Sequence, residues 1–84
     1  MWFVYILRCA DQTLYTGITT NIARRVHEHN AKTKGAKYTK VKRPVTLVYQ
    51  EPATSRSHAL KREAEMKRLS RKEKLVLISC HRLS

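Results

Sequence analysis

Two tyrosines, an arginine, a histidine and a glutamate occur at spacings that would let them form one reactive site. A planar guanidinium binds a phosphate through two parallel hydrogen bonds and keeps its charge. A carboxylate can hold a divalent cation, and a phenol or an imidazole can orient or deprotonate water. Such a set contains the groups that hydrolysis of a phosphodiester requires. The residues are Tyr5, Tyr15, Arg25, His29 and Glu63.

The arginine and the histidine fall on one predicted helix. Four residues within 22–30 stand at i, i+3, i+4 and i+7, so they share the face that should pack on a sheet. They are Ile22, Arg25, Val26 and His29. One interpretation is that Arg25 and His29 lie at the edge of this stripe and extend their polar ends to water. The other is that both point into a cleft beside the sheet, where Arg25 would suit a phosphate.

The glutamate belongs to a later helix, predicted over about 57–69. Glu63 is the carboxylate nearest the apolar side of that helix, on a face with Ala59 and Met66. One interpretation is an i, i+4 ion pair with Lys67, which contributes little to stability. The other is a metal site, because the chain has only six carboxylates and few to offer a cation. One carboxylate, waters and phosphate oxygens are reasonable ligands for Mg²⁺.

The tyrosines lie on two strands that we expect to pair. Tyr5 is in the predicted strand 2–8, and Tyr15 is in the predicted strand 13–19, two residues before Gly17. A glycine inside a strand is typical of a bulge or a close approach of other groups. The tyrosines could pack as ordinary core residues with their hydroxyls at the rim, or could join the reactive site.

The pattern along the chain predicts an α+β fold. Residues 2–8 are apolar on both alternating faces, which indicates a central strand covered on both sides. A turn at Asp11-Gln12 should form a hairpin with the next strand, and Glu51-Pro52 should stop a third strand over 45–50. A capping-box sequence at 70–73 should begin a last helix. The order β-β-α-β-α-α predicts a three-stranded, mainly antiparallel sheet flanked by helices.

Length and composition restrict the class of protein. Eighty-four residues predict one domain, spanning 1–84, with a thin core. No apolar run approaches the length of a membrane span, and we expect neither a secretory signal nor a membrane partner. Cys9 and Cys80 are too few for a disulfide scaffold or a four-thiolate zinc site. A reducing, cytoplasmic setting is therefore expected.

The charge favours a nucleic acid as partner. Eighteen Lys and Arg against six Asp and Glu give a net charge of +12. Neutralised phosphates release counterions, so a domain of this charge gains from binding DNA or RNA. The segment 31–43 is predicted to be a mobile basic loop that contacts phosphates. Its cations are Lys32, Lys34, Lys37, Lys40, Lys42 and Arg43.

Four motifs in a fixed order resemble those of one family. The chain resembles the GIY-YIG nuclease superfamily from about residue 2 to residue 80, and it is most similar to small stand-alone bacterial members. The motifs are Val4-Tyr5-Ile6, Tyr15-Thr16-Gly17, the N-x-x-R-R-x-x-x-H stretch from Asn21 to His29, and A-L-x-x-E from Ala59 to Glu63.

The resemblance implies a metal-dependent endonuclease that hydrolyses DNA phosphodiester bonds in DNA repair or processing. It implies that Glu63 holds a single Mg²⁺ or Mn²⁺ and that Arg25 contacts the scissile phosphate. Tyr5 would take the proton from the attacking water while Tyr15 positions water or phosphate, although these two roles could be exchanged. His29 would lie near the scissile phosphate.

The chain also departs from the family pattern. Val4 and Thr16 replace a glycine and an isoleucine of the first two motifs, and no Asn follows Asn30, whereas many members carry one in the last helical region. Larger relatives have a separate DNA-binding domain. This chain should therefore recognise DNA shape, cut weakly and broadly, or depend on a protein partner. The alternative function is a nucleic-acid-binding module that keeps the fold and does not cut.

Overall fold

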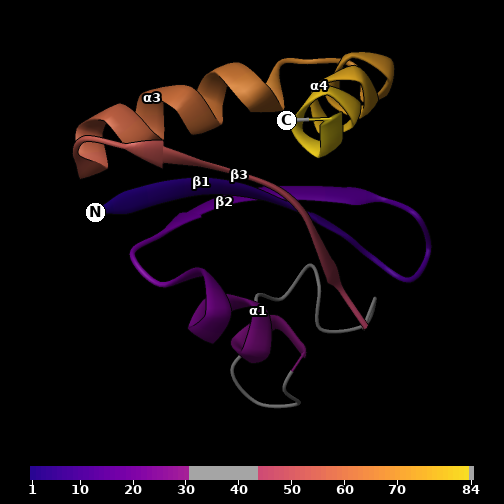
Figure 1. Cartoon of the computed structure of the whole chain (residues 1–84), viewed down its shortest axis with the longest axis horizontal. Helices are drawn as coiled ribbons and strands as arrows, with labels where there is room; N and C mark the ends of the chain where they lie inside the picture. Colours follow the sequence, from indigo (N-terminus) through magenta and orange to yellow (C-terminus); the bar gives the residue numbers. More distant parts are fainter. Residues whose placement is uncertain (31–43, 84) are drawn as a thin grey trace.

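The computed structural model describes residues 1–30 and 44–83 of the chain. The element order is β-β-α-β-α-α, as predicted, and Figure 1 shows the sheet between two helical layers. In chain order the elements are β1 (Trp2–Arg8), β2 (Leu14–Thr19), α1 (Ile22–Asn30), β3 (Thr46–Ala53), α3 (Arg56–Lys67) and α4 (Arg71–Leu83).

The sheet has the order β2-β1-β3, and β1 is antiparallel to both neighbours. This confirms the prediction of a central first strand in an antiparallel sheet. The β1–β2 hairpin closes through the predicted turn, in which Gln12 has a φ of 73°. The Oδ1 atom of Asp11 accepts hydrogen bonds from the backbone N–H of Thr13 at 3.1 Å and from its hydroxyl at 2.6 Å. Such a local carboxylate bond fixes the turn without a glycine.

The prediction that Glu51-Pro52 ends the third strand is wrong. Strand β3 continues to Ala53, and Pro52 pairs with Phe3. Because β3 is an edge strand, one side of its backbone faces away from the sheet. A proline there need not remove a hydrogen bond of the ladder.

A bulge divides β3 into two parts. Leu7 pairs with Leu47 and Ile6 pairs with Tyr49, so Val48 is an additional residue on β3. An additional residue reverses the alternation of side chains beyond it. Leu47 therefore packs on one face of the sheet, whereas Tyr49 packs on the other.

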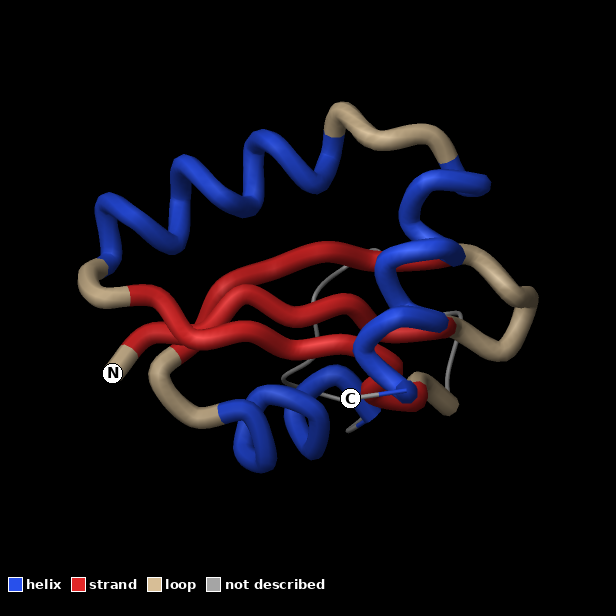
Figure 2. The backbone as a smooth tube through the Cα atoms, turned by 45° about the horizontal axis from the view of Figure 1, so that its top comes forward, coloured by secondary structure: helices blue, strands red, loops and turns tan. Residues whose placement is uncertain are grey.

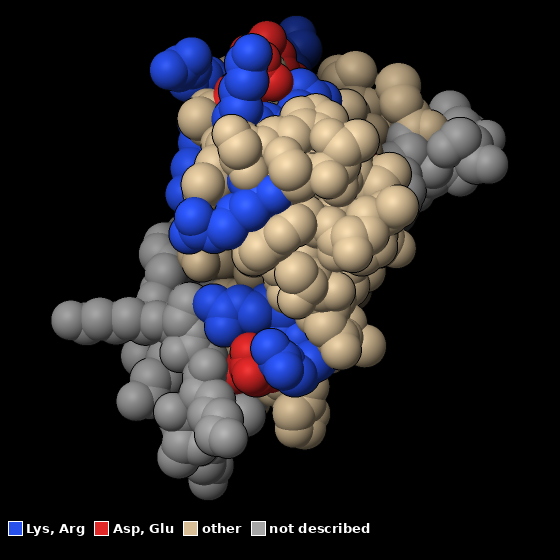
Figure 3. Space-filling model, turned by 90° about the vertical axis from the view of Figure 1, so that its left-hand side faces the viewer, with Lys and Arg blue, Asp and Glu red and all other residues tan. Residues whose placement is uncertain are grey.

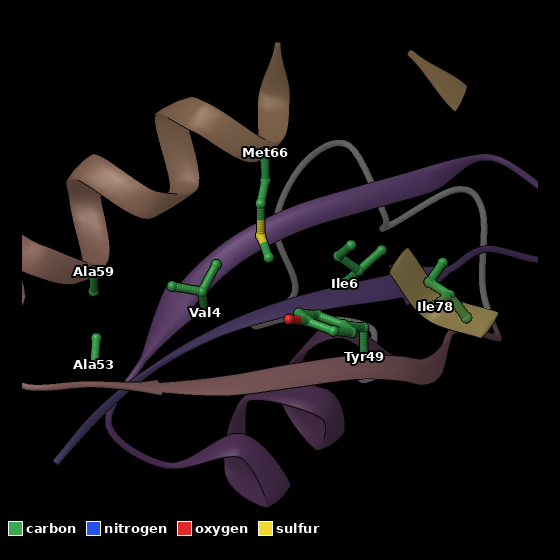
Figure 4. Close-up of a cluster of buried hydrophobic side chains, with 7 residues drawn as sticks. All are labelled: Val4, Ile6, Tyr49, Ala53, Ala59, Met66 and Ile78. Atoms are coloured by element: carbon green, nitrogen blue, oxygen red, sulfur yellow. The ribbon is translucent and has the colours of Figure 1, made fainter. Parts of the chain in front are cut away.

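Helix α1 covers one face of the sheet, and α3 and α4 cover the opposite face (Figures 1 and 2). The core accordingly has two clusters. The cluster on the α1 face contains Tyr5, Leu7, Cys9 and Val45. The cluster beneath α3 and α4, drawn in Figure 4, contains Val4, Ile6, Tyr49, Ala53, Ala59, Met66 and Ile78.

Side-chain caps fix the starts of the two later helices. The Oγ atom of Ser55 accepts a hydrogen bond from the N–H of His58 at 3.1 Å and begins α3. Ser70 and Glu73 form the predicted capping box, in which Glu73 accepts from the Ser70 N–H at 2.9 Å and Ser70 accepts from the Glu73 N–H at 3.2 Å. Within the part of the chain that the structure describes, none of the helices is long and apolar enough to cross a membrane.

Candidate active site

A buried tyrosine and a buried histidine form the centre of the site. Tyr5 points from β1 toward α1 and is 1% exposed, and His29 at the end of α1 is fully buried. The Tyr5 hydroxyl lies 3.1 Å from Nε2 of His29, within hydrogen-bond distance. The interpretation of His29 as a residue at the stripe's edge that reaches water is therefore wrong. Its ring points inward, because the Tyr5 hydroxyl gives it a polar partner there.

Gly17 makes room for the Tyr5 ring. The two residues are direct partners on β2 and β1. A Cβ atom built on Gly17 would lie 2.6 Å from the Tyr5 hydroxyl oxygen and 2.8 Å from Cζ. Contacts this short are not tolerated, so the aromatic ring occupies space that a side chain at position 17 would need. The glycine marks a close approach, as the sequence indicated.

Tyr15 completes a cluster of three rings. Its ring centroid is 6.4 Å from that of Tyr5 and 5.0 Å from that of His29, and the second contact is edge-to-face. Such contacts between ring edges and faces fix the orientation of each ring. The two tyrosines and the histidine therefore pack together as one group on the α1 face of the sheet.

Arg25 connects this group to solvent. Its guanidinium is hydrogen-bonded to the Tyr5 hydroxyl and to Glu28, whose Oε1 lies 3.2 Å from Nη1. The Arg25 side chain is 32% exposed, so its charge remains accessible to a phosphate. Glu28 was absent from the sequence prediction. Its i, i+3 spacing from Arg25 and i, i+4 spacing from Arg24 are the signals that could have revealed it.

The environment controls which groups are charged. Burial raises the pKa of Tyr5, and the hydrogen bond from Arg25 acts in the opposite direction. Burial, assisted by the nearby charge of Arg25, lowers the pKa of His29 to about 4. At neutral pH the imidazole of His29 is therefore uncharged and can accept or donate one proton through Nε2.

Glu63 lies on α3, which covers the face of the sheet opposite α1 (Figure 1). Its Oε2 atom is 3.5 Å from Nζ of Lys67, so the ion pair that the spacing allowed is present. The Glu63 side chain is 19% exposed. Its charge acts on Tyr5, where it contributes the smallest of the effects on the pKa of that hydroxyl. The carboxylate therefore has a small electrostatic effect on the Tyr5 hydroxyl.

The donor set near Glu63 restricts the kind of metal that could bind. No group of three or more His, Cys, Asp or Glu residues suited to a metal ion occurs within 1–30 and 44–83. Zn²⁺ in a protein site takes three or four such ligands. Mg²⁺ keeps several waters and is often bound through one or two carboxylates and substrate phosphates. A lone carboxylate such as Glu63 is compatible only with a cation that takes most of its ligands from water and substrate oxygens.

Basic side chains are exposed at two levels on one side of the molecule (Figure 3). In the view of Figure 3, Lys and Arg side chains gather near the top of the molecule, where α3 lies in Figure 1, and again lower down, where α1 lies. Acidic side chains stand beside the basic ones at both levels (Figure 3). The cations of the segment 31–43 that were predicted to bind phosphates lie outside the described residues. They are Lys32, Lys34, Lys37, Lys40, Lys42 and Arg43.

The sheet, the tyrosine pair and the arginine define an α+β domain with a basic, tyrosine-lined site. The family model described as the GIY-YIG catalytic domain matches residues 1–75. The chain belongs to the GIY-YIG nuclease family, which confirms the resemblance drawn from the four motifs.

Several proteins that are similar to this chain in sequence are UPF0213 proteins. A UPF0213 protein of Desulfotalea psychrophila is 61% identical over 77 residues, which is 92% of this chain and 70% of that protein. One from Syntrophus aciditrophicus is 59% identical over 90% of this chain and 87% of its own length.

Two solution NMR structures share the fold. The UPF0213 protein of Bacillus halodurans is 44% identical, with a TM-score of 0.60 over 95% of this chain and 85% of that one. A protein from E. faecalis is 40% identical, with a TM-score of 0.65 over 98% of this chain and 86% of that one.

Proposed function

We propose that this chain, as a single domain over 1–84, is a divalent-metal-dependent endonuclease that hydrolyses DNA phosphodiester bonds in DNA repair or processing. The observation that carries the proposal is the Tyr5 hydroxyl, which is held between the Arg25 guanidinium and Nε2 of His29. In this arrangement, a guanidinium that could bind a phosphate and an imidazole that could accept a proton both interact with the hydroxyl of Tyr5. The family membership supports the reaction class.

In the proposed mechanism, Arg25 binds the scissile phosphate and stabilises the charge that develops on it. The phosphate competes with Glu28 for the guanidinium. Glu63 would hold Mg²⁺ or Mn²⁺, which neutralises the phosphate and activates water when bound.

Tyr5 is proposed to take the proton from the attacking water. Because burial raises its pKa, Tyr5 is protonated at neutral pH and must lose its own proton to act. Because His29 is a weak base, the two transfers must occur together: the phenol O–H bond breaks toward Nε2 of neutral His29 as the phenol oxygen takes the proton of the attacking water, so that no free phenolate forms. Tyr15, in edge contact with His29, is then placed to position water or phosphate. The exchange of the two tyrosine roles remains an alternative within the same proposal.

The test is cleavage of labelled single-strand, duplex, flap, fork and four-way-junction DNA with Mg²⁺, Mn²⁺ or EDTA, with an RNA duplex alongside. Wild type should cut at least one DNA only when metal is present. Glu63→Gln should abolish cutting and leave DNA binding intact. Arg25→Ala should lower the rate roughly 10²-fold, as expected for loss of a donor to the transition-state charge.

Glu65→Gln is the matched control, because it makes the same change two residues away on an exposed part of α3. It should cut like wild type. Tight, salt-sensitive binding without cutting of any substrate would instead indicate a binding module or a nuclease that requires a protein partner. Cutting by Glu63→Gln at the wild-type rate would remove Glu63 from the site.

A further inference from the structure

A polar network joins β3 to α3 on the face opposite the tyrosine cluster. Arg62 donates from Nε to Oε2 of Glu51 at 2.9 Å. Tyr49 donates its hydroxyl proton to Oε1 of the same carboxylate at 2.6 Å. The Glu51 and Arg62 side chains are 22% and 33% exposed, so the ion pair is partly shielded from water. Glu51 therefore holds two partners in a fixed geometry beside α3.

The apolar packing of α3 rests on a narrow stripe of residues. Its buried residues are Ala59 and Met66, while Leu60 is exposed. Alanine has a short side chain, and methionine adapts its shape to irregular gaps. Two such residues define the rotation of a helix about its axis less sharply than a broad apolar stripe would, so a polar contact at the edge of the stripe can help to fix it.

Arg62 and Glu63 flank this narrow apolar stripe on opposite sides. Successive residues of an α-helix are about 100° apart, so these neighbours cannot share one direction. Arg62 extends to Glu51 on β3, at one edge of the sheet. Glu63 is coupled to Tyr5 on the central strand, and α3 also packs against β2, at the other edge. A rotation that released Arg62 would therefore move Glu63 as well.

We propose that Arg62, held by Glu51, is a positioning residue that fixes the rotation of α3 and thereby the place of the Glu63 carboxylate as a metal ligand. The inference rests on the proposed function, because it takes Glu63 to be that ligand. Arg62 does not touch the substrate or the metal in this scheme. Its effect is on metal affinity rather than on DNA affinity.

The test measures metal binding directly as well as activity. Mn²⁺ is titrated into ¹⁵N-labelled protein bound to a short DNA duplex whose linkages resist hydrolysis, and broadening of the amide signals around Glu63 is followed. The Mn²⁺ concentration that gives half-maximal cleavage of a normal duplex is measured in parallel. Glu51→Gln and Arg62→Gln should each raise both concentrations roughly 10-fold, the low end for loss of a group that orients a metal ligand. The Kd for DNA should stay unchanged.

Two controls separate positioning from general loss of stability. Glu65→Gln removes the other carboxylate partner of Arg62, at 3.4 Å, and keeps the bond to β3. Ile78→Ala weakens the core beneath α4 and serves as a destabilised variant with the ion pair intact. Both should bind Mn²⁺ like wild type.

Unchanged Mn²⁺ binding in Glu51→Gln and Arg62→Gln would overturn the inference, and so would an equal change in Ile78→Ala. If wild type itself neither cuts nor shows broadening near Glu63, the proposed metal site fails, and the inference fails with it. The two failures can be told apart. Failure of the metal site appears in the wild-type protein itself, whereas failure of the inference alone appears only in the variants.

Discussion

At the scale of single residues, the position of the Tyr5 hydroxyl depends on the absence of a side chain at Gly17. Tyr5 is 1% exposed, and its ring lies over the glycine of the paired strand. His29 holds the hydroxyl at 3.1 Å from the other side. The phenol therefore has little freedom to move without breaking an interaction.

Gly17→Ala should displace Tyr5 and impair cleavage. The new Cβ would lie 2.6 Å from the hydroxyl oxygen and 2.8 Å from Cζ, so the buried ring would have to shift. A displacement near 1 Å of a reacting group typically costs about 10²-fold in rate. Single-turnover cleavage measures the loss, and the ring signals of His29 in an NMR spectrum report the broken hydrogen bond to Tyr5.

Thr16→Val is the matched control on the neighbouring residue. Thr16 pairs with Ile6, so it points to the opposite face, and its buried Oγ1 has no hydrogen-bond partner among the residues that the structure describes. Replacing such a hydroxyl with a methyl group should be nearly neutral. If Gly17→Ala cleaves DNA at the wild-type rate and its His29 ring signals are unchanged, the proposed role of the glycine is contradicted.

His29 should make stability depend on pH. Its pKa is about 4 in the folded protein and near 6.5 in an unfolded chain. Between these values the unfolded state binds more protons, so the free energy of unfolding falls as the pH drops from 6.5 toward 4. The loss is on the order of 3 kcal/mol at most, and urea unfolding at pH 7 and pH 4 measures it.

The change of unfolding free energy with pH should be smaller in His29→Gln. His27→Gln, an exposed histidine on the same helix, should leave the pH dependence as in wild type. If His29→Gln keeps the full dependence, other groups cause it.

The sequence could predict only part of the site at this scale. The i, i+4 spacing of Arg25 and His29 placed both on one face of α1, as the structure confirms. It could not decide which side chain would be buried, because that depends on Tyr5 from another strand. The partners Glu51 and Arg62 are eleven residues apart on different elements, and no local pattern indicates such a pair.

At the scale of secondary structure elements, α3 depends on its first turn. Ser55 accepts from the backbone N–H of His58, which otherwise has no partner within the helix. Ser55→Ala should lower the free energy of unfolding by about 1 kcal/mol. Urea unfolding measures the change.

Ser57→Ala, an exposed serine inside the same helix, is the control for that cap. Alanine is the better helix former, so this variant should be as stable as wild type or slightly more stable. Equal destabilisation by both substitutions would show that the cap is not the cause.

Most elements could be predicted from periodicity because each has a simple pattern. The doubly apolar run of β1 and the amphipathic α1 agree with the structure in their bounds. The end of β3 could not be predicted in the same way. Whether Pro52 stops a strand depends on its place at the sheet edge, which is a property of the whole sheet.

At the scale of the whole molecule, charge should control how tightly DNA binds. Six of the eighteen Lys and Arg residues lie in the segment 31–43, outside the described residues. Replacing Lys37 and Lys40 with alanine should weaken binding to all sequences alike. The slope of log K against log salt should decrease by about 0.9 for each phosphate that is no longer neutralised.

Salt-dependent binding assays on two unrelated duplexes check this expectation. Lys61→Ala, an exposed lysine on α3, removes one charge elsewhere on the surface and should leave the slope unchanged. A loss of affinity on one duplex and not on the other would mean that the segment 31–43 reads base sequence.

The additional residue in β3, Val48, changes which face of the sheet every later residue of that strand points to. Leu47, Tyr49 and Glu51 are spaced by two, yet Leu47 belongs to the core beneath α1, whereas Tyr49 and Glu51 face α3. One strand thus supplies both layers. A single-residue deletion at Val48 would restore strict alternation, and one half of the strand would then present its side chains to the wrong layer. Length changes in this strand should therefore be tolerated only in compensating pairs, even though its edge position leaves it open to solvent on one side.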